Sequence, residues 1–260
     1  MEIIIKPNAA GAQEEAARIF AWQIQRRPDS VLGLATGSTP LGVYALLAAL
    51  HRKGPLDFSR VHTFNLDEYV GLGPAHPGSY RTYMREHLFS RVNLCVENIH
   101  FPDGLANDIP AHCAEYEASI QRAGGIDLQL LGLGRDGHIG FNEPSSSLSS
   151  RTRIKTLTPQ TVADNAKFFG GKDKVPHHVI TMGVGTIMDA RECVLLALGP
   201  AKADAVAGAA EGPITADLPG SVLQMHPRCR LIVDEAAAAK LRRADYYRWV
   251  YENKPEWQRV

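Results

Sequence analysis

Short, continuously apolar runs separated by amphipathic stretches constrain this fold more than any other feature of the sequence. A run such as ECVLLAL (192–198) has apolar residues on both faces of a strand, so it predicts a strand buried on both sides. Buried strands that alternate with helices predict an α/β fold, with a mainly parallel sheet flanked by helices and right-handed crossovers. We expect strands at 2–5, 30–35, 60–65, 126–131, 178–182, 192–198 and 229–233, and helices at 12–26, 39–51, 79–90, 109–123, 200–210 and 234–242.

The chain of 260 residues is long enough to bury one large core or two small ones. No repeat, low-complexity tract or long linker divides it, and the turn-rich stretches 73–79 and 145–150 predict loops. We therefore expect a single domain over residues 1–260. The apolar stretch near the N-terminus is too short for a signal peptide, and no segment approaches the ~18 apolar residues of a membrane span. The expected location is cytoplasmic, without a membrane partner.

Charge and cysteine usage exclude several classes of partner. The 28 Lys and Arg residues balance the 28 Asp and Glu residues, and no basic run stands out. A neutral chain of this kind has no electrostatic reason to bind nucleic acid or an anionic membrane. The four cysteines are widely spaced without a Cys-x-x-Cys pair, which indicates reduced thiols rather than a disulfide framework or a zinc site.

The stretch LLGLGRDGHIGFNEPSSS (130–147) contains G-x-G-x-x-G directly after an apolar run, the pattern of a dinucleotide-binding loop. Such a loop needs a helix that begins within the motif and an acidic residue about 20 positions further on. Here Pro144 and a serine run disfavour a helix, and the later segment TRIKTLTP has no carboxylate. We therefore expect no nicotinamide cofactor.

Glycines in a loop without a helix allow the backbone to turn sharply and to approach a ligand closely. In open α/β sheets, ligands bind beyond the carboxyl ends of the strands, and this loop leaves the strand 126–131 at that end. We expect the loop to present acid–base groups to a crevice, namely Asp136, His138 and Glu143.

A second loop has the features of an anion site. The strand 30–35 is followed by Thr36, Gly37, Ser38 and Thr39, and Pro40 suits the first turn of the next helix. Backbone N–H groups, hydroxyls and the positive end of the helix dipole can bind a monophosphate there, although an ordinary Ser/Thr helix cap has the same sequence. Lys202, at the start of the helix 200–210, opposes the helix dipole unless a bound anion reverses the balance.

Two adjacent acids, Asp67 and Glu68, follow the strand 60–65 at the same edge of the sheet. We expect one of them to lie in a solvated turn and the other to be a candidate general base. Their spacing does not decide between them.

These segments together resemble the glucosamine-6-phosphate deaminase family of sugar-phosphate isomerases. TGSTP, FNLDEYVGL, GRDGHIGFNEPSSSLSSRTRIKTLT and MGVGTIMDA follow in the family's order between about residues 30 and 240. The resemblance implies one Rossmann-like α/β domain without a dinucleotide, no metal and no cofactor. It also implies conversion of the small-molecule partner D-glucosamine 6-phosphate, with water, into D-fructose 6-phosphate and ammonium in amino-sugar catabolism.

Site residues follow from the same resemblance, position by position. Asp67 matches the general base, His138 the ring-opening histidine, and Asp136 and Glu143 the acids that orient that histidine. The phosphate loop matches Thr36 to Thr39 and the phosphate lysine matches Lys202. Lys167 stands where the family usually has arginine; lysine keeps the charge but loses the bidentate fork.

The segment SRTRIKTLT resembles the effector site of the hexameric members that N-acetylglucosamine 6-phosphate activates. The residues that match effector contacts are Ser146, Arg153, Lys155 and Thr156. A charged strand at a subunit contact is the alternative, and a homo-oligomer is expected. The C-terminal tail does not resemble that of the activated members, and we expect its aromatic residues to pack on the body or on a neighbouring subunit: Tyr246, Tyr247, Trp249, Tyr251 and Trp257.

Two other functions fit parts of the pattern. A 6-phosphogluconolactonase-like hydrolase would keep the phosphate loop without needing DEYVGL together with DGHIGFNEP. A non-enzymatic sugar-phosphate sensor would have no use for a poised base. Because the expected reaction includes no redox step and no His, Cys and acid cluster has metal-ligand spacing in the sequence, we expect neither cofactor nor metal.

Overall fold

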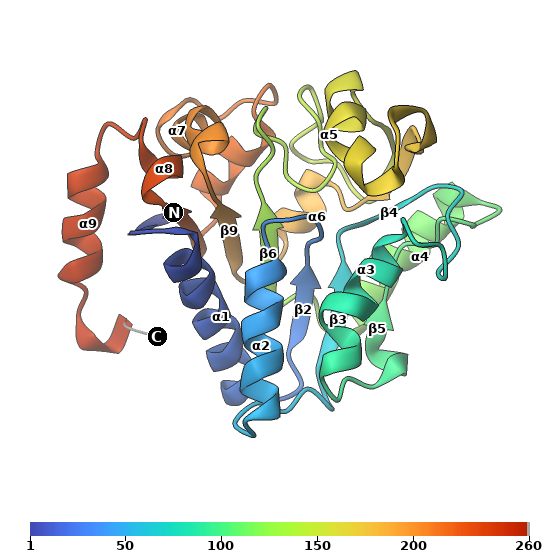
Figure 1. Cartoon of the computed structure of the whole chain (residues 1–260), viewed down its shortest axis with the longest axis horizontal. Coiled ribbons are helices and arrows are strands. Elements are labelled where there is room, and N and C mark those ends of the chain that lie inside the picture. The colour runs from blue at the N-terminus through green and yellow to red at the C-terminus, as the bar shows by residue number, and fades with distance from the viewer. Residues whose placement is uncertain (259–260) are drawn as a thin grey trace.

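Seven strands, all paired in parallel, form the central sheet of the computed structural model, which describes residues 1–258 (Figure 1). Their order is β1 (Glu2–Lys6), β10 (Cys229–Asp234), β9 (Cys193–Ala197), β6 (Leu128–Gly132), β2 (Val31–Leu34), β3 (His62–Asn65) and β5 (Ile99–His100). Six of the seven predicted strands lie in this sheet, and β9 is buried along its whole length. The α/β prediction with a mainly parallel sheet is confirmed.

A second sheet of three antiparallel strands stands beside the first, in the order β4 (Asp67–Tyr69), β8 (His178–Thr181) and β7 (Arg153–Thr156). The predicted strand 178–182 belongs here and not to the parallel sheet. The sequence shows that β8 is apolar but does not show its partners, because strand direction depends on the loops before and after it. The strands β4, β5 and β7 were not predicted, since they have only two to four residues and β7 alternates charged with uncharged side chains.

Helices flank the central sheet, and α1 and α2 pack against each other in front of the strands in Figure 1. Their bounds are α1 (Ala9–Arg26), α2 (Leu41–Arg52), α3 (Tyr80–His87), α4 (Ile109–Arg122), α5 (Pro159–Phe169), α6 (Val184–Met188), α7 (Ala203–Glu211), α8 (Glu235–Ala238) and α9 (Ala244–Glu252). The expected helix over 234–242 is wrong in extent, because the chain turns after one helical turn and begins again as α9. The helices α5 and α6 were not predicted, although Thr158 before Pro159 is an ordinary N-terminal signal for α5.

The larger hydrophobic core lies between the seven-stranded sheet and its helices, and a smaller one lies beneath the three-stranded sheet. The smaller core consists of Tyr69, Phe141, Leu157, Val162, Val175 and Val179. The single-domain organisation over 1–260 stays a prediction. All four cysteines are free, as expected, and among the described residues no helix is long and apolar enough to cross a membrane.

The C-terminal helix α9 divides its aromatic residues between two environments. Tyr247 and Tyr251 pack against the main core, whereas Tyr246 and Trp249 are 58% and 62% exposed. The expected packing onto the body is therefore found for two of these rings; the side chain of Trp257 lies outside the described residues.

One buried carboxylate connects three segments at the amino ends of the central strands. Asp127 accepts hydrogen bonds from Val31 N (2.9 Å), Arg27 (2.5 Å) and Arg191 (2.6 Å). Arg27 follows α1, Val31 begins β2 and Arg191 precedes β9. A single side chain therefore holds the ends of three elements together. A buried carboxylate that is fully paired in this way leaves several polar groups unsatisfied when it is removed.

We expect Asp127→Ala to lower the free energy of unfolding by about 2–4 kcal/mol, measured by urea denaturation. Asp189→Ala is the matched control, because Asp189 also pairs with an arginine, Arg151 at 2.6 Å, but is 67% exposed. That variant should lose less than about 1 kcal/mol. Equal losses in the two variants would contradict the role of Asp127.

Candidate active site

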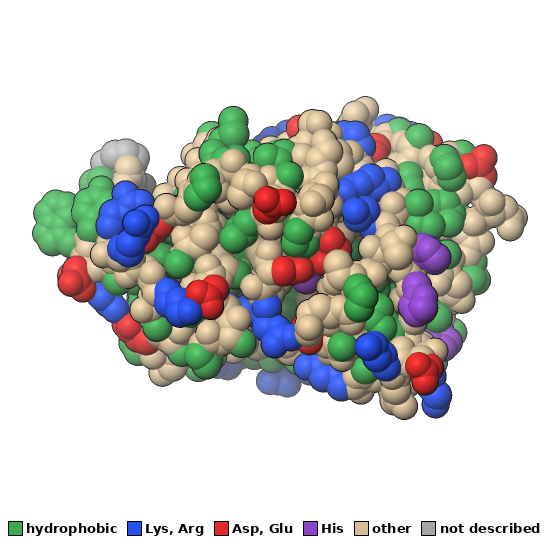
Figure 2. Space-filling view, turned by 90° about the horizontal axis from the view of Figure 1, so that it is seen from above, with side chains coloured by type: hydrophobic (Ala, Val, Ile, Leu, Met, Phe, Trp, Pro, Cys, Tyr) green, Lys and Arg blue, Asp and Glu red, His purple; other side chains and the backbone are tan. Residues whose placement is uncertain are grey.

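A cavity of about 420 Å³ opens at the carboxyl ends of the parallel strands. In Figure 1 the arrows of β2, β6 and β9 point towards this end of the molecule, above which α5 lies. Figure 2 looks onto the same end, where acidic and basic side chains lie close together around a hollow. The cavity is lined by Ala35, Thr36, Gly37, Ser38, Thr39, Leu66, Asp67, Tyr80, Gly132, Leu133, Gly134, Arg135, His138, Gly140, Phe141, Thr161, Asp164, Asn165, Lys167, Phe168 and Lys202.

The glycine-rich loop after β6 is a tight turn and not the start of a helix. Gly137 N donates to Gly134 O (3.1 Å), Gly134 N donates to His138 O (2.8 Å), and no helix follows before α5 in the described chain. A Cβ on Gly134 would lie 2.4 Å from His138 Nδ1, and Gly137 has a φ of 84°. The glycines therefore make room for His138, and the expectation that no helix follows the motif is confirmed.

His138 lies between two carboxylates. Its Nδ1 is 2.7 Å from Asp136 Oδ1 and 3.4 Å from Glu143 Oε2. Burial alone would lower the pKa of His138, but hydrogen bonds and charge attraction from both acids raise it to about 9. Burial likewise acts to raise the pKa of Asp136, but the hydrogen bond and charge of His138 hold it well below its usual range. At neutral pH the ring is therefore an imidazolium.

With Nδ1 turned towards the carboxylates, Nε2 is the ring nitrogen available to a ligand. The carboxylate of Glu143 is itself held in place, because its Oε1 accepts a hydrogen bond from Thr161 Oγ1 at 2.6 Å. Thr161 is a residue of α5, so the position of this helix affects the orientation of the histidine. Sequence reasoning missed Thr161.

Asp136, His138 and Glu143 offer atoms that all lie within 4.8 Å of one another, a grouping that could hold a metal ion. The expectation that no such cluster exists is therefore wrong in geometry, because the turn brings together residues whose spacing in the sequence is irregular. The same three groups also form a carboxylate–imidazole–carboxylate cluster, in which Nδ1 lies close to both acids. That the protein works without a metal stays a prediction.

The structure separates the two adjacent acids at the start of β4. Asp67 lines the cavity, whereas the Glu68 carboxylate accepts hydrogen bonds from the backbone N–H groups of Tyr69 (2.9 Å), Tyr80 (3.0 Å) and Arg81 (3.1 Å). The expected solvated turn is wrong, since Asp67 and Glu68 are only 4% and 3% exposed. Glu68 holds the start of α3, a role that depends on contacts 12 and 13 residues away.

Asp67 is the most strongly perturbed carboxyl group of the cavity. Its burial and the neighbouring Glu68 charge raise the pKa of Asp67 to about 8, against smaller opposing effects of His138 and Thr36. Among the described residues its Oδ1 has no hydrogen-bond partner. A buried carboxyl with an unsatisfied oxygen and a pKa near the working pH is suited to accept a proton from a ligand.

The loop from Thr36 to Thr39 is held from two sides. The hydroxyl of Tyr83 donates to Gly37 O (2.6 Å), the hydroxyl of Tyr44 donates to Ala35 O (2.5 Å), and Gly37 has a φ of 95°. The helix α2 begins after Pro40, which makes no side-chain capping bond. The alternative that these Ser and Thr residues merely cap the helix is therefore wrong, since α2 has no side-chain capping bond and these residues line the cavity instead.

Three basic residues also line this cavity: Lys202, Lys167 and Arg135. Burial, then the positive charge of Arg135, lowers the pKa of Lys202, with a further contribution from Lys167. Cations close enough to lower the pKa of Lys202 favour the binding of an anion. Arg135 was not among the predicted residues, although it lies within the same conspicuous motif.

The four residues matched to effector contacts lie outside the cavity. Ser146 is buried, and Arg153 donates a hydrogen bond to Asn142 Oδ1 at 2.9 Å. Arg153 and Lys155 share one face of β7, whereas Thr156 lies on the opposite, more exposed face.

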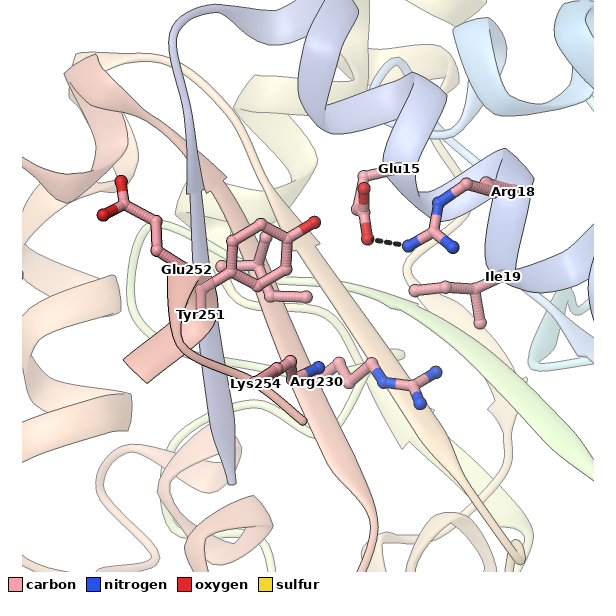
Figure 3. A pocket seen from close by; sticks show the side chains of 8 residues that line it. Glu15, Arg18, Ile19, Arg230, Tyr251, Glu252 and Lys254 are labelled. Atoms are coloured by element: carbon pink, nitrogen blue, oxygen red, sulfur yellow. Dashed lines mark hydrogen bonds and ion pairs between the residues drawn. The ribbon is translucent and has the colours of Figure 1, made fainter. Parts of the chain in front are cut away.

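A second cavity of about 430 Å³ lies between α1, β10 and the end of α9 (Figure 3). Its cations are paired with carboxylates: Arg18 with Glu15, Arg230 with Glu192 (2.5 Å) and Lys254 with Glu2. None of the acid–base residues described above lines it. The cavity at the carboxyl ends of the strands is therefore the candidate active site.

Comparison with known proteins agrees with this geometry. A family model described as glucosamine-6-phosphate isomerases/6-phosphogluconolactonase matches residues 7–231. The glucosamine-6-phosphate deaminase of Arthrobacter sp. (strain FB24) is 57% identical over 99% of both chains, and that of Streptomyces coelicolor is 53% identical over 100% of both. The solved structure of a monomeric glucosamine-6-phosphate deaminase superposes with a TM-score of 0.91 at 42% identity, covering 92% of this chain and 100% of its own.

A more distant solved structure shows the fold alone. The 6-phosphogluconolactonase from Trypanosoma cruzi superposes with a TM-score of 0.74 at 21% identity, over 93% of this chain and 97% of its own. The expected Rossmann-like α/β architecture is thus shared with both kinds of protein.

The raised pKa of Asp67 predicts a pH-dependent cost in stability. Because the pKa is about 8 in the folded state and near 3.8 in the unfolded state, the folded protein binds the extra proton between these values. The free energy of unfolding should therefore fall as the pH rises from 4 through 8. We expect Asp67→Asn to remove this component and to be more stable than the wild type at pH 9 by on the order of 2–4 kcal/mol.

Urea denaturation between pH 5 and pH 9 measures this difference. Asp189→Asn, which changes an exposed carboxylate, is the control and should follow the wild-type pH dependence. If the Asp67→Asn curve also ran parallel to the wild-type curve, Asp67 would not carry the buried charge described above.

Proposed function

The chain belongs to the glucosamine-6-phosphate isomerase/6-phosphogluconolactonase family, and from this we propose that its cavity converts D-glucosamine 6-phosphate and water into D-fructose 6-phosphate and ammonium. It is an enzyme of amino-sugar metabolism that acts as both deaminase and isomerase. One observation supports the assignment of the site most directly: Asp67 and His138 open onto the same cavity as the loop Thr36–Thr39 and Lys202.

The phosphate group anchors the substrate at one end of this cavity. The Thr36–Thr39 loop contributes hydroxyls beside the N-terminus of α2, and Lys202 and Lys167 contribute positive charge. Binding at the phosphate positions the sugar carbons near the acid–base groups without using those groups for affinity.

Ring opening requires a proton on the ring oxygen of the closed sugar. His138, with its pKa raised to about 9, carries that proton at neutral pH and can donate it from Nε2. Asp136 and Glu143 hold the ring in the required orientation through Nδ1. Their negative charge also stabilises the imidazolium before it reacts.

Isomerisation then moves a proton from C2 of the open sugar to C1. Asp67, in its ionised form, takes the proton from C2 and returns it to C1, because one carboxylate can reach two adjacent carbons. The C1 oxygen also gains a proton and the C2 nitrogen gives one up, so the product is an imine at C2 with a hydroxyl group on C1. Water adds to that carbon, and ammonia leaves to give the ketone of fructose 6-phosphate.

The alternative functions have less support. A lactonase needs no proton transfer between two carbons, and the superposed lactonase shares only the fold with this chain. A sensor would not require a carboxyl whose pKa is raised to about 8 inside the ligand cavity. Homo-oligomeric assembly, effector binding at Ser146, Arg153, Lys155 and Thr156, and the cytoplasmic location stay predictions.

The function is tested by incubating the purified protein with glucosamine 6-phosphate and measuring ammonium and fructose 6-phosphate together. We expect Asp67→Asn to lower kcat by ~10²–10⁴ with KM within a few-fold, because a positioned base contributes that much. Lys202→Ala should mainly raise KM, since it removes a contact with the phosphate. Absence of both products, with hydrolysis of 6-phosphogluconolactone instead, would establish the lactonase alternative.

The two opposed protonation states predict a bell-shaped pH dependence of kcat/KM. Asp67 must be ionised, which gives a rising limb near its pKa of about 8, and His138 must be protonated, which gives a falling limb near about 9. Glu143→Gln removes a charge that stabilises the imidazolium, so the falling limb should move to lower pH by about one unit.

The wild type and Glu143→Gln are compared on the same substrate, so the titration of the substrate affects both pH profiles equally. The rising limb should move much less than the falling limb, because Glu143 is not among the groups that set the pKa of Asp67 and His138 has only a smaller effect on it. A falling limb that stayed in place in Glu143→Gln would exclude His138 as the group responsible.

A further inference from the structure

Arg135 lines the candidate active site beside the catalytic turn but has no role in the function described so far. It lies between Gly134 and Asp136, and its guanidinium reaches across the cavity to α5. There one of its nitrogens lies 2.7 Å from Asp164 Oδ1 and 3.0 Å from Asp164 Oδ2. Both partners line the cavity, and their side chains are 49% and 47% exposed. Arg135 is thus a cation held at the cavity by a single, half-exposed carboxylate.

Such an ion pair is weak, because water screens both charges and the two side chains lose freedom when they pair. A phosphate monoester carries a charge of about −1.5 to −2 at neutral pH and offers three oxygens, against one negative charge on Asp164. The planar guanidinium matches two of those oxygens at once. Phosphate entering the cavity can therefore replace Asp164 as the partner of Arg135.

Neither of the other two cations of the cavity, Lys167 and Lys202, can make a bidentate contact with phosphate. Lys167 extends its ammonium over the ring of the exposed Phe168, 4.9 Å from the ring centre, and as a lysine it cannot form a bidentate contact. Lys202 contributes a single ammonium from the position just before α7. Arg135 and Lys202 line the same cavity, and the charge of Arg135 lowers the pKa of Lys202.

We propose that Arg135 binds the substrate phosphate, and that it exchanges the carboxylate of Asp164 for phosphoryl oxygens when the substrate enters. This inference rests on the proposed function for the identity of the phosphate ester. In this proposal Arg135, in the loop after β6, makes the bidentate contact with phosphate that Lys167 cannot make. The residue that contacts the phosphate is then the immediate neighbour of Asp136, which orients the catalytic histidine.

The test uses inorganic phosphate as the probe, with its Kd measured by calorimetry, and KM and kcat for glucosamine 6-phosphate. In Arg135→Ala we expect the Kd for phosphate and the KM each to rise about tenfold, with kcat changed less than about threefold. Asp164→Ala should lower the Kd for phosphate, because Arg135 loses its competing carboxylate. The double variant should bind phosphate as weakly as Arg135→Ala.

Lys172→Ala is the control, since Lys172 is an exposed cation just after α5 that does not line the cavity. The proposal is overturned if Arg135→Ala matches this control within twofold. It is also overturned if Asp164→Ala weakens phosphate binding as much as Arg135→Ala and the double variant adds nothing, which is the behaviour of a purely structural ion pair. Calorimetry decides these outcomes without turnover, whereas a wild-type protein that releases no ammonium would refute the proposed function instead.

Discussion

The parallel alignment of the central strands is the constraint on which the active site depends. Parallel strands place all their carboxyl ends at one edge, so the loops after β2, β3 and β6 open onto the same space although they lie far apart in the sequence. Each loop then contributes one function: Thr36–Thr39 can bind an anion, Asp67 can accept a proton, and His138 can donate one. Asp127 holds the amino ends of the strands together at the opposite edge of the sheet. One edge therefore contributes to stability, whereas the other carries the catalytic groups.

The active site also requires two buried side chains to carry a charge. Asp67 and His138 are needed in ionised forms, yet burial opposes ionisation of both. The protein treats them differently. His138 receives two carboxylates, which raise its pKa above neutrality, whereas Asp67 has Glu68 beside it and an oxygen without a partner. The histidine is thereby stabilised as an acid, and the aspartate is kept reactive as a base at a cost in folding free energy.

Sequence reasoning predicted the parts of this structure that depend on local pattern. Continuous apolar runs located the strands of the central sheet, and Pro144 with the serine run showed that no helix follows the glycine motif. It missed what depends on contacts between distant segments. The three-residue strand β4 exists because β8 pairs with it, and Glu68 is buried because backbone groups at the start of α3 need an acceptor. No pattern within either segment carries that information.

The helix α5 was missed although Thr158 and Pro159 give it a local start signal, and this helix links the two ends of the cavity. Residues three, four and seven positions apart on one face of the helix line the cavity: Thr161, Asp164, Asn165 and Phe168. Thr161 bonds Glu143 at the acid–base end, Asp164 pairs with Arg135, and Asn165 donates to the hydroxyl of Tyr69 at 3.0 Å. Because one rigid element carries all three contacts, a displacement of α5 changes the orientation of the histidine and the position of Arg135 together. Binding and proton transfer are therefore coupled through a helix that contributes Lys167 to phosphate binding but no group to the proton transfers.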